Sequence, residues 1–195
     1  MKNILLATVA AFATATATAT AAFAEGPVTN WGGFYAGITF GAKVGGDMNY
    51  TPGPSYPSLE SGSSFGGFAG YNIQRNKFVY GGEISYSDAA GHGPVGFPAE
   101  EFNYFMDLKA RAGMAVDKTL FYGFVGYSDG EFEFAGGPKH NVSGTNYGIG
   151  MDVKLGERFF VGAEYIVRDL SGTSNPGQTQ DTMIQAVQLR TGWKF

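Results

Sequence analysis

The stretch Phe102–Met114 (FNYFMDLKARAGM) decides the fold, because its side chains alternate with a period of two residues. Its even positions are all apolar or aromatic, and its odd positions read Asn, Phe, Asp, Lys, Arg and Gly. Such alternation is typical of a β-strand whose two faces meet different surroundings. We therefore predict a strand with Asp107, Lys109 and Arg111 on one face and the apolar row on the other.

The same pattern recurs along the chain. It is clear in Thr145–Leu155 and in the C-terminal run Val187–Phe195, where Leu, Trp and Phe alternate with Arg, Gly and Lys. Together with Phe102–Met114 and five segments that are weaker or undetermined in face, this predicts eight strands. The weaker segments are Phe65–Gln74, Phe78–Ser87 and Phe159–Arg168, and the undetermined ones are Gly33–Gly45 and Thr119–Phe134.

The connections alternate in length. Three are short and turn-like: Gln74–Lys77, Val116–Lys118 and Gly156–Arg158. Four are longer: Asp47–Gly62, Asp88–Glu100, Ala135–Val142 and Ser171–Thr182. This order predicts an antiparallel up-and-down meander with every long loop at one end and both termini at the other, as in transmembrane β-barrels.

Composition indicates which face is inside. The chain has 31 glycines, and charged residues make up only 15% of it. The glycines have no collagen period, and the 15% aromatic content is unlike a disordered chain. The narrow interior of an eight-stranded barrel needs small residues. Six glycines fall in the polar rows: Gly81, Gly113, Gly148, Gly150, Gly162 and Gly192. We therefore predict an all-β fold, an eight-stranded transmembrane barrel with bulky side chains facing lipid. A soluble, lipocalin-like periplasmic barrel is the alternative.

Aromatic residues near the strand ends are predicted to form girdles at the two membrane interfaces, because their rings are apolar and carry a polar edge. In the predicted strand Phe102–Met114, the apolar row that faces lipid begins at Phe102. The predicted girdle residues are Phe34, Tyr35, Tyr71, Tyr86, Tyr122, Tyr147, Tyr165, Trp193 and Phe195.

The N-terminus has the layout of a secretory signal peptide. Lys2 supplies the positive region, Ile4–Ala13 is an apolar run, and Ala22-Phe23-Ala24 matches an A-x-A cleavage site. We expect residues 1–24 to be removed, with Glu25 as the first mature residue and 25–195 as the barrel.

The polar rows carry ten charged residues that are predicted to lie inside the barrel. Charges in a narrow interior are tolerated when they are paired and hydrogen-bonded, so we expect an ion-pair network. This network would be a structural polar plug or, alternatively, the gate of a small conductance. The ten residues are Glu83, Asp107, Lys109, Arg111, Asp152, Lys154, Glu164, Arg168, Arg190 and Lys194.

No catalytic, cofactor or metal site is predicted. His92 and His140 fall in expected surface loops, where a solvated histidine is the usual case. Ser143 is close to His140 in sequence, and Glu131 and Glu133 lie on the preceding strand, but nothing in the pattern brings a nucleophile and a base together. The chain has no cysteine, and its net charge of −4 is unlike that of a nucleic-acid-binding protein.

Two motifs carry a resemblance to a known family. The terminus Gln188–Phe195 (QLRTGWKF) resembles the C-terminal recognition signal of bacterial outer-membrane barrels, with Leu189, Trp193 and Phe195 as its apolar residues. The segment Asn30–Ala42 (NWGGFYAGITFGA) resembles the opening strand, W-x-G-F-Y-x-G, of the outer membrane protein β-barrel domain family, which is related to OmpA-like barrels. The resemblance implies residence in a Gram-negative outer membrane, contact with its lipid and lipopolysaccharide, and delivery to the barrel-assembly machinery through the last strand.

The sequence indicates the place and shape of the protein better than its activity. We expect a structural or surface-interaction role, with extracellular loops available to partners. The alternatives are a narrow or gated pore and a lipid-modifying barrel enzyme.

Overall fold

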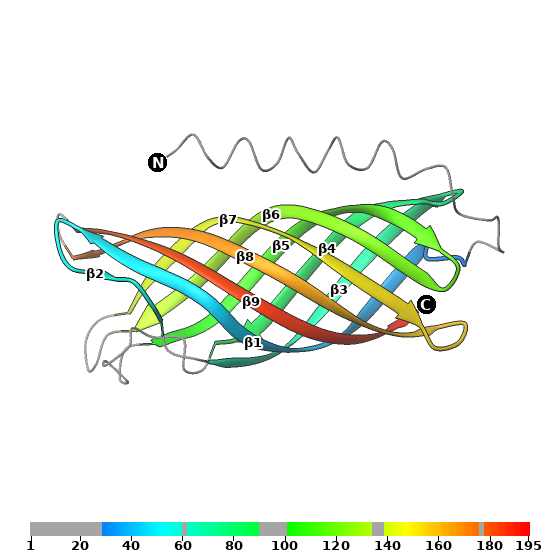
Figure 1. The fold of residues 1–195 in the computed structure, drawn as a ribbon, viewed down its shortest axis with the longest axis horizontal. Coiled ribbons are helices and arrows are strands. Elements are labelled where there is room, and N and C mark those ends of the chain that lie inside the picture. Colours follow the sequence, from blue (N-terminus) through cyan, green and yellow to red (C-terminus); the bar gives the residue numbers. More distant parts are fainter. Residues whose placement is uncertain (1–28, 60–61, 90–100, 134–138, 176–177) are drawn as a thin grey trace.

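The computed structural model describes residues 29–59, 62–89, 101–133, 139–175 and 178–195. The predicted signal peptide, its cleavage residues Ala22, Ala24 and Glu25, and His92 lie outside these ranges. The described residues form nine strands (Figure 1): β1 Gly33–Thr51, β2 Ser55–Tyr56, β3 Ser63–Arg75, β4 Phe78–Asp88, β5 Glu101–Val116, β6 Thr119–Glu133, β7 Lys139–Lys154, β8 Phe159–Asn175 and β9 Gln178–Lys194.

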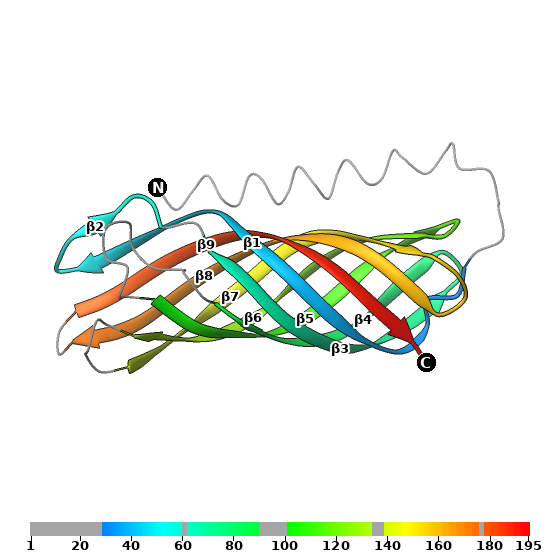
Figure 2. The same cartoon turned by 90° about the horizontal axis from the view of Figure 1, so that it is seen from below.

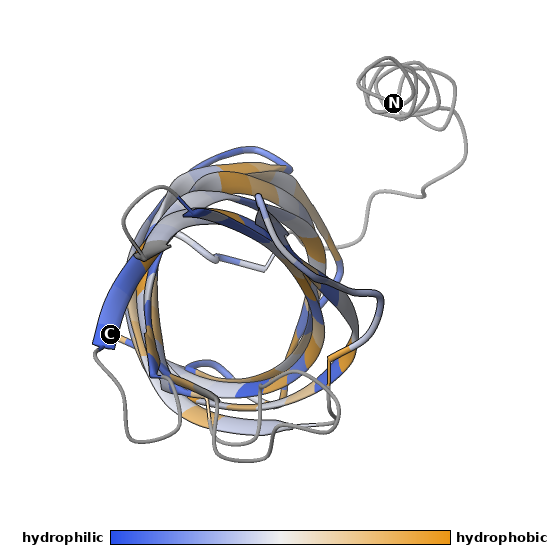
Figure 3. Cartoon of the chain, turned by 90° about the vertical axis from the view of Figure 1, so that its left-hand side faces the viewer, coloured by the Kyte–Doolittle hydropathy of each residue, from blue (hydrophilic) through white to orange (hydrophobic). Residues whose placement is uncertain are grey.

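Eight of the strands close into a barrel. From β3 to β9 each strand pairs antiparallel with the next, β1 pairs with β3, and β1 pairs with β9 to complete the ring. The short β2 pairs with β1 alone among the described strands, through Met48 and Asn49. Figure 2 shows the barrel from a second side, and Figure 3 shows the ring end-on. The prediction of an eight-stranded up-and-down barrel is confirmed.

The tight turns gather at one end of the barrel, at the right of Figure 1, which we call the short-turn end. Asn76 and Asp117 occupy two of these turns with φ values of 55° and 52°. Asn and Asp tolerate this left-handed conformation better than other residues with a Cβ. The longer connections leave from the opposite end, the long-loop end.

No helix in the described part of the chain is long and apolar enough to cross a membrane.

The strands reach further into the long-loop end than predicted. The expected loop Ser171–Thr182 is mostly strand, because β8 runs to Asn175 and β9 starts at Gln178. Likewise, β7 starts at Lys139 and β1 continues to Thr51. Six of the eight barrel strands have 15 to 19 residues, whereas about 9–11 are enough to cross a bilayer. These strands therefore project beyond the membrane-spanning part.

Glycines line the inner face where rings pack flat against the wall. A Cβ added to Gly148 would lie 2.5 Å from Cζ of Phe124 and would overlap the carbonyl oxygen of Tyr165. A Cβ on Gly150 would overlap the ring of Tyr122. A Cβ on Gly192 would overlap the ring of Phe160, whereas one on Gly81, Gly113 or Gly162 would overlap a backbone carbonyl oxygen of the neighbouring strand. The small residues of the polar rows thus make room for aromatic rings inside.

The two strands of undetermined face are now assigned. On β1, Tyr35 and Thr39 point inward and Phe34 and Ile38 outward. On β6, the outward row includes Phe121, Val125 and Tyr127, and the inward row is Leu120, Tyr122, Phe124, Ser128 and Phe132.

Three predicted outward aromatics are wrong. Tyr35 and Tyr122 are buried inside, because their hydroxyls donate hydrogen bonds to carboxylates of the interior, Glu83 and Glu164 respectively. Phe102 is also buried, because a β-bulge between Phe102 and Tyr104 shifts the alternation and turns Phe102 to the same inward face as Phe105.

Candidate functional site

The candidate site is the interior of the barrel together with its two ends. Inward rows of β4, β5, β7, β8 and β9 place six charged side chains at one level, each at most 3% exposed. Three carboxylates face three cations there, so the group is electrically balanced. We call this group the central cluster: Glu83, Asp152, Glu164, Lys109, Arg111 and Arg190.

Glu83 is the hub of the central cluster. Its Oε2 accepts hydrogen bonds from Nη1 of Arg111 and Nη2 of Arg190, both at 2.6 Å, and from the Tyr35 hydroxyl at 3.1 Å. Its Oε1 accepts from Lys109 at 3.5 Å and from Nη1 of Arg190 at 3.2 Å. This carboxylate is therefore shared among all three cations of the cluster.

The other two carboxylates complete the pairing. Glu164 accepts from Lys109 and, at 2.8 Å, from Nη1 of Arg190. Asp152 accepts from Nη2 of Arg111 at 3.1 Å and lies 3.3 Å from Nε of Arg190. Every charge in the cluster has at least two partners of opposite sign, which is the condition for keeping ions in a dry interior.

Aromatic rings fill the space around these charges. The guanidinium carbon of Arg190 lies 4.0 Å from the ring centroid of Phe68, and that of Arg111 lies 3.8 Å from that of Tyr122. Nζ of Lys109 lies 4.7 Å from the ring of Phe124. Ring faces attract cations, so these contacts both stabilise the cluster and occupy the lumen.

A second ion pair lies nearer the long-loop end. Nε and Nη2 of Arg168 each donate to Asp107 at 2.8 Å, which makes a two-bond fork. Ser128 and Ser85 donate to the same carboxylate at 2.6 and 3.1 Å. Asp107 is thereby fully hydrogen-bonded by residues from three other strands.

The structure brings eight of the ten predicted interior charges into these two groups. The other two lie at the short-turn end. Lys154 donates to the carbonyl oxygens of Asn30 and Glu157 at 2.6 and 3.0 Å and lies over the ring of Trp31. Lys194 is half-buried and forms no ion pair with the residues that the structure describes.

The short-turn end is closed by Trp31. Its backbone N–H donates to Gln74 at 2.5 Å, and its ring packs edge-on against Phe160. A cavity of about 10 Å³ remains beside Tyr35 and Arg111, room for about one water. Side chains therefore fill the ring seen end-on in Figure 3.

The long-loop half reverses the polarity of the wall. On β6 the outward row changes from Phe121, Val125 and Tyr127 to Asp129 and Glu131. On β7, β8 and β9 the outward residues of this half are also mainly polar, among them Asn141, Ser143, Thr145, Asp169, Ser171, Thr179, Asp181 and Gln185.

The inward residues of the same half form an apolar core. We call this part of the barrel the crown and its buried residues the crown core: Met48, Tyr50, Leu59, Ala89, Phe102, Phe105, Phe132, Val142, Leu170 and Ile184. The crown is thus built like a soluble β-barrel, apolar inside and polar outside, whereas the spanning part has the opposite arrangement.

Outward tyrosines stand where the polarity changes. Tyr127 donates its hydroxyl to Ser143 at 2.8 Å, and Tyr165 donates to Gln185 at 2.8 Å. Both acceptors are two pairs further toward the long-loop end, because Tyr127 pairs with Thr145 and Tyr165 with Val187. Rings on the apolar side and hydroxyls on the polar side are what an interfacial tyrosine requires.

The residues weighed for catalysis do not form a site. His140 lies on β7 with Nε2 2.7 Å from Oε1 of the buried Gln180, whereas Ser143 lies on the opposite face of the same strand and is bonded by Tyr127. Glu131 and Glu133 face outward and contact Asn103 and Lys139. The described residues contain no group of three or more His, Cys, Asp or Glu side chains that could hold a metal ion.

The predicted assembly residues lie on the outer face of the last strand. Leu189 and Trp193 are exposed on β9, and Phe195 follows with its backbone N–H bonded to the carbonyl oxygen of Phe34. They form one apolar row opposite Arg190 and Lys194, the arrangement that the alternation of Val187–Phe195 predicted.

Fold and interior define a class of protein: a closed β-barrel with an apolar outer belt and a plugged, charged interior. The profile of the Outer membrane protein beta-barrel domain family matches residues 5–195. The chain belongs to this family, and it is an outer-membrane β-barrel protein of Gram-negative bacteria.

Solved structures with a similar fold include OprG of Pseudomonas aeruginosa, at 11% identity and a TM-score of 0.50, covering 86% of this chain and 98% of OprG. The N-terminal β-barrel domain of Pseudomonas aeruginosa OprF has 14% identity and a TM-score of 0.46, covering 82% of this chain and 97% of that domain. Ail of Yersinia pestis, solved in complex with the heparin analogue sucrose octasulfate, has 12% identity, a TM-score of 0.39 and coverage of 81% and 99%. No curated protein matches the sequence.

Proposed function

We propose that the protein is a closed structural barrel that holds a rigid crown outside the membrane for surface interaction. The observation that carries this proposal is the packed crown core above a filled lumen. Transport requires a continuous path, whereas the central cluster, Trp31 and the crown core obstruct three successive levels. Because the crown is already folded, its surface loses little conformational entropy when a partner binds, which favours recognition.

The orientation follows from the general architecture of such barrels, in which short turns face the periplasm and long loops face the exterior. We infer that the crown is extracellular.

We also propose that residues 1–24 are the signal peptide, cut between Ala24 and Glu25, and that Leu189, Trp193 and Phe195 are read by the assembly machinery. N-terminal sequencing of the purified barrel tests the first point, and the yield of folded Phe195→Ala barrel in cells tests the second.

A planar-bilayer experiment tests closure. Folding is verified first, by a difference in gel migration between boiled and unboiled protein. The folded protein should then give no discrete conductance steps. Regular steps from the native chain would contradict closure and support the gated pore. Glu83→Ala is the matched variant, because a gate held by the central cluster would open more often once its hub is removed.

A complementation experiment tests the surface role. In a deletion strain, we compare the native chain with the variant Asp129→Asn/Asp169→Asn/Asp181→Asn, which changes only the outer face of the crown. A surface role predicts equal amounts of folded barrel but loss of function by the variant. If both chains restore resistance to a large antibiotic equally, the role is envelope integrity and the surface proposal fails.

A further inference from the structure

Charge is divided unequally between the two ends of the barrel. The central cluster and the pair Asp107–Arg168 are each balanced. At the long-loop end, the described acidic side chains outnumber Lys43 and Lys139: they are Asp47, Asp88, Asp129, Glu131, Glu133, Asp169 and Asp181. At the short-turn end the balance is reversed, with Asp117 and Glu157 against Arg75, Lys77, Lys118, Lys154, Arg158 and Lys194.

Four basic residues of the short-turn end lie in or directly beside its three described hairpin turns. Arg75 ends β3 and Lys77 lies in the β3–β4 turn, Lys118 lies in the β5–β6 turn and Arg158 in the β7–β8 turn. Because strand order follows the chain around the barrel, these turns are spaced around its rim. Their positive charges form a ring instead of converging on one point. We call these four residues the basic rim: Arg75, Lys77, Lys118 and Arg158.

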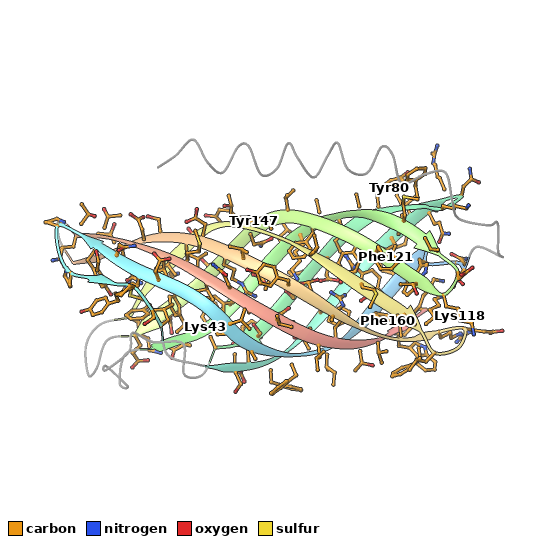
Figure 4. The ribbon with its side chains drawn as sticks, in the orientation of Figure 1. Lys43, Tyr80, Lys118, Phe121, Tyr147 and Phe160 are labelled. Carbon is orange, nitrogen blue, oxygen red and sulfur yellow. The ribbon has the colours of Figure 1, made fainter. Side chains whose placement is uncertain are left out.

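Outward aromatic residues adjoin the basic rim. Phe78 follows Lys77, Phe121 is close to Lys118, and Phe159 follows Arg158 and pairs with Trp193. Figure 4 shows Lys118 at the same end of the barrel as Tyr80 and Phe121, whereas Tyr147 lies near the middle of its length. Aromatic girdles sit at the headgroup level of a membrane, so the basic rim lies at or just outside that level.

The side chains of the basic rim are not occupied by the protein itself. Arg75, Lys118 and Arg158 are exposed, and within the described residues none of them forms an ion pair. Long basic side chains beside an apolar belt extend toward the headgroups with their stems on apolar surface. Their natural counter-charge at this depth is the phosphate of a lipid headgroup.

We propose that the basic rim binds anionic phospholipid headgroups of the leaflet at the short-turn end. The ring shape favours lipid over a single soluble anion or a protein patch, because an annulus of headgroups is the partner that meets all three turns at once. The acidic long-loop end offers no such attraction, so the preference is confined to one leaflet. This inference is independent of the surface role of the crown.

The two tryptophans of the chain allow a direct test. Trp193 is exposed to lipid and pairs with Phe159, next to Arg158, whereas Trp31 is buried. The full barrel is folded into vesicles of phosphatidylcholine and phosphatidylglycerol, with brominated acyl chains on one lipid or on the other. Quenching of Trp193 then reports which headgroup is enriched beside the rim.

We expect brominated phosphatidylglycerol to be enriched about fivefold over brominated phosphatidylcholine in an equimolar mixture, the effect of one basic group at an anionic surface. The variant Arg75→Gln/Lys118→Gln/Arg158→Gln should lose this preference, and so should the native chain at high salt. The control Lys139→Gln removes a basic charge from the other end and should keep it. Equal quenching by the two lipids in the native chain, or a preference that survives the triple substitution, would overturn the proposal.

Discussion

Arg190 and Glu83 form a two-bond ion pair across the lumen, although β9 and β4 share no hydrogen-bonded edge. Nη2 of Arg190 donates to Oε2 of Glu83 at 2.6 Å and Nη1 donates to Oε1 at 3.2 Å. Between their strands lie β1 and β3. The pair thus ties opposite parts of the wall together, and with Arg111 and Lys109 it makes one cross-linked layer.

Replacing Glu83 should be the most destabilising single change to the central cluster. Glu83→Ala leaves three buried cations with two carboxylates, and breaking a buried pair in this way costs about 3–5 kcal/mol. Arg111→Ala should also lower stability, because it leaves Glu83 and Asp152 each one partner short. Urea unfolding in phosphatidylcholine vesicles measures both, with the exposed Asp181→Asn as control. Unfolding midpoints equal to that of the native chain would show that the cluster does not stabilise the barrel.

The pair Asp107–Arg168 should behave as a unit. Asp107→Asn or Arg168→Met alone leaves an uncompensated buried charge, whereas the double variant leaves none. We therefore expect the double variant to lose less stability than the sum of the two single losses, with a coupling of about 1–3 kcal/mol. A double-mutant cycle by urea unfolding gives this coupling directly. Strict additivity would mean that water or other groups compensate each charge separately.

Gly148 should not accept a side chain. In Gly148→Ala the new methyl group overlaps the Tyr165 carbonyl and the Phe124 ring, so we expect a loss of about 1–3 kcal/mol. Gly123→Ala is the matched control, because its Cβ points outward and the nearest atom is 3.7 Å away. Both variants remove a strand glycine, and only the inward one meets an obstacle. Similar unfolding midpoints for the two would contradict the inward packing of Phe124.

The sequence predicts the spanning part of this fold well, because lipid on one side and a narrow lumen on the other impose a clean alternation. The C-terminal strand is an example, since Leu189 and Trp193 face out and Arg190 faces in, as its pattern indicates. The crown escapes the same reasoning. Beyond the lipid the outer face no longer needs to be apolar, so polar residues such as Ser171 and Asp181 fill the outward row. The sequence of Ser171–Thr182 therefore looks like that of a loop.

The interior was predictable as a set of residues and unpredictable as a set of contacts. Alternation alone selects Asp107, Lys109 and Arg111 as one face of a strand. The partner of each charge depends on barrel closure, which brings Glu83 to Arg190 from more than a hundred residues away. The inward tyrosines also escape a rule based on polarity, because Tyr35 and Tyr122 pack like apolar residues and hydrogen-bond like polar ones.

The crown should unfold more easily than the spanning barrel when its core is opened. Phe132 is fully buried against Phe102, with ring centroids 5.0 Å apart, so Phe132→Ala should cost about 3–5 kcal/mol locally. The expected result is protease cutting within the crown of vesicle-embedded protein while the spanning strands stay protected. Glu133→Ala, one residue along on the outward face, is the control. If Phe132→Ala is no more sensitive than that control, the crown has no core of its own.

The carboxyls of Glu131 and Glu133 should stay ionised to lower pH than ordinary glutamates. Hydrogen bonds from the Asn103 amide, at 2.8 and 3.1 Å, and then the contacts of Lys139 hold the pKa of both groups below the usual value. Because their pKa is lower in the folded chain, their contribution to stability is present above the unfolded pKa of about 4.3. It is lost as the pH falls through the lower, folded pKa.

Carbon-13 NMR titration of the side-chain carboxyls measures the midpoints directly. Asn103→Ala should move both midpoints up toward the ordinary value, whereas Asp181→Asn should leave them unchanged. Midpoints that do not respond to Asn103→Ala would show that the bulge, which turns Phe102 inward, does not also hold Asn103 against this acidic pair.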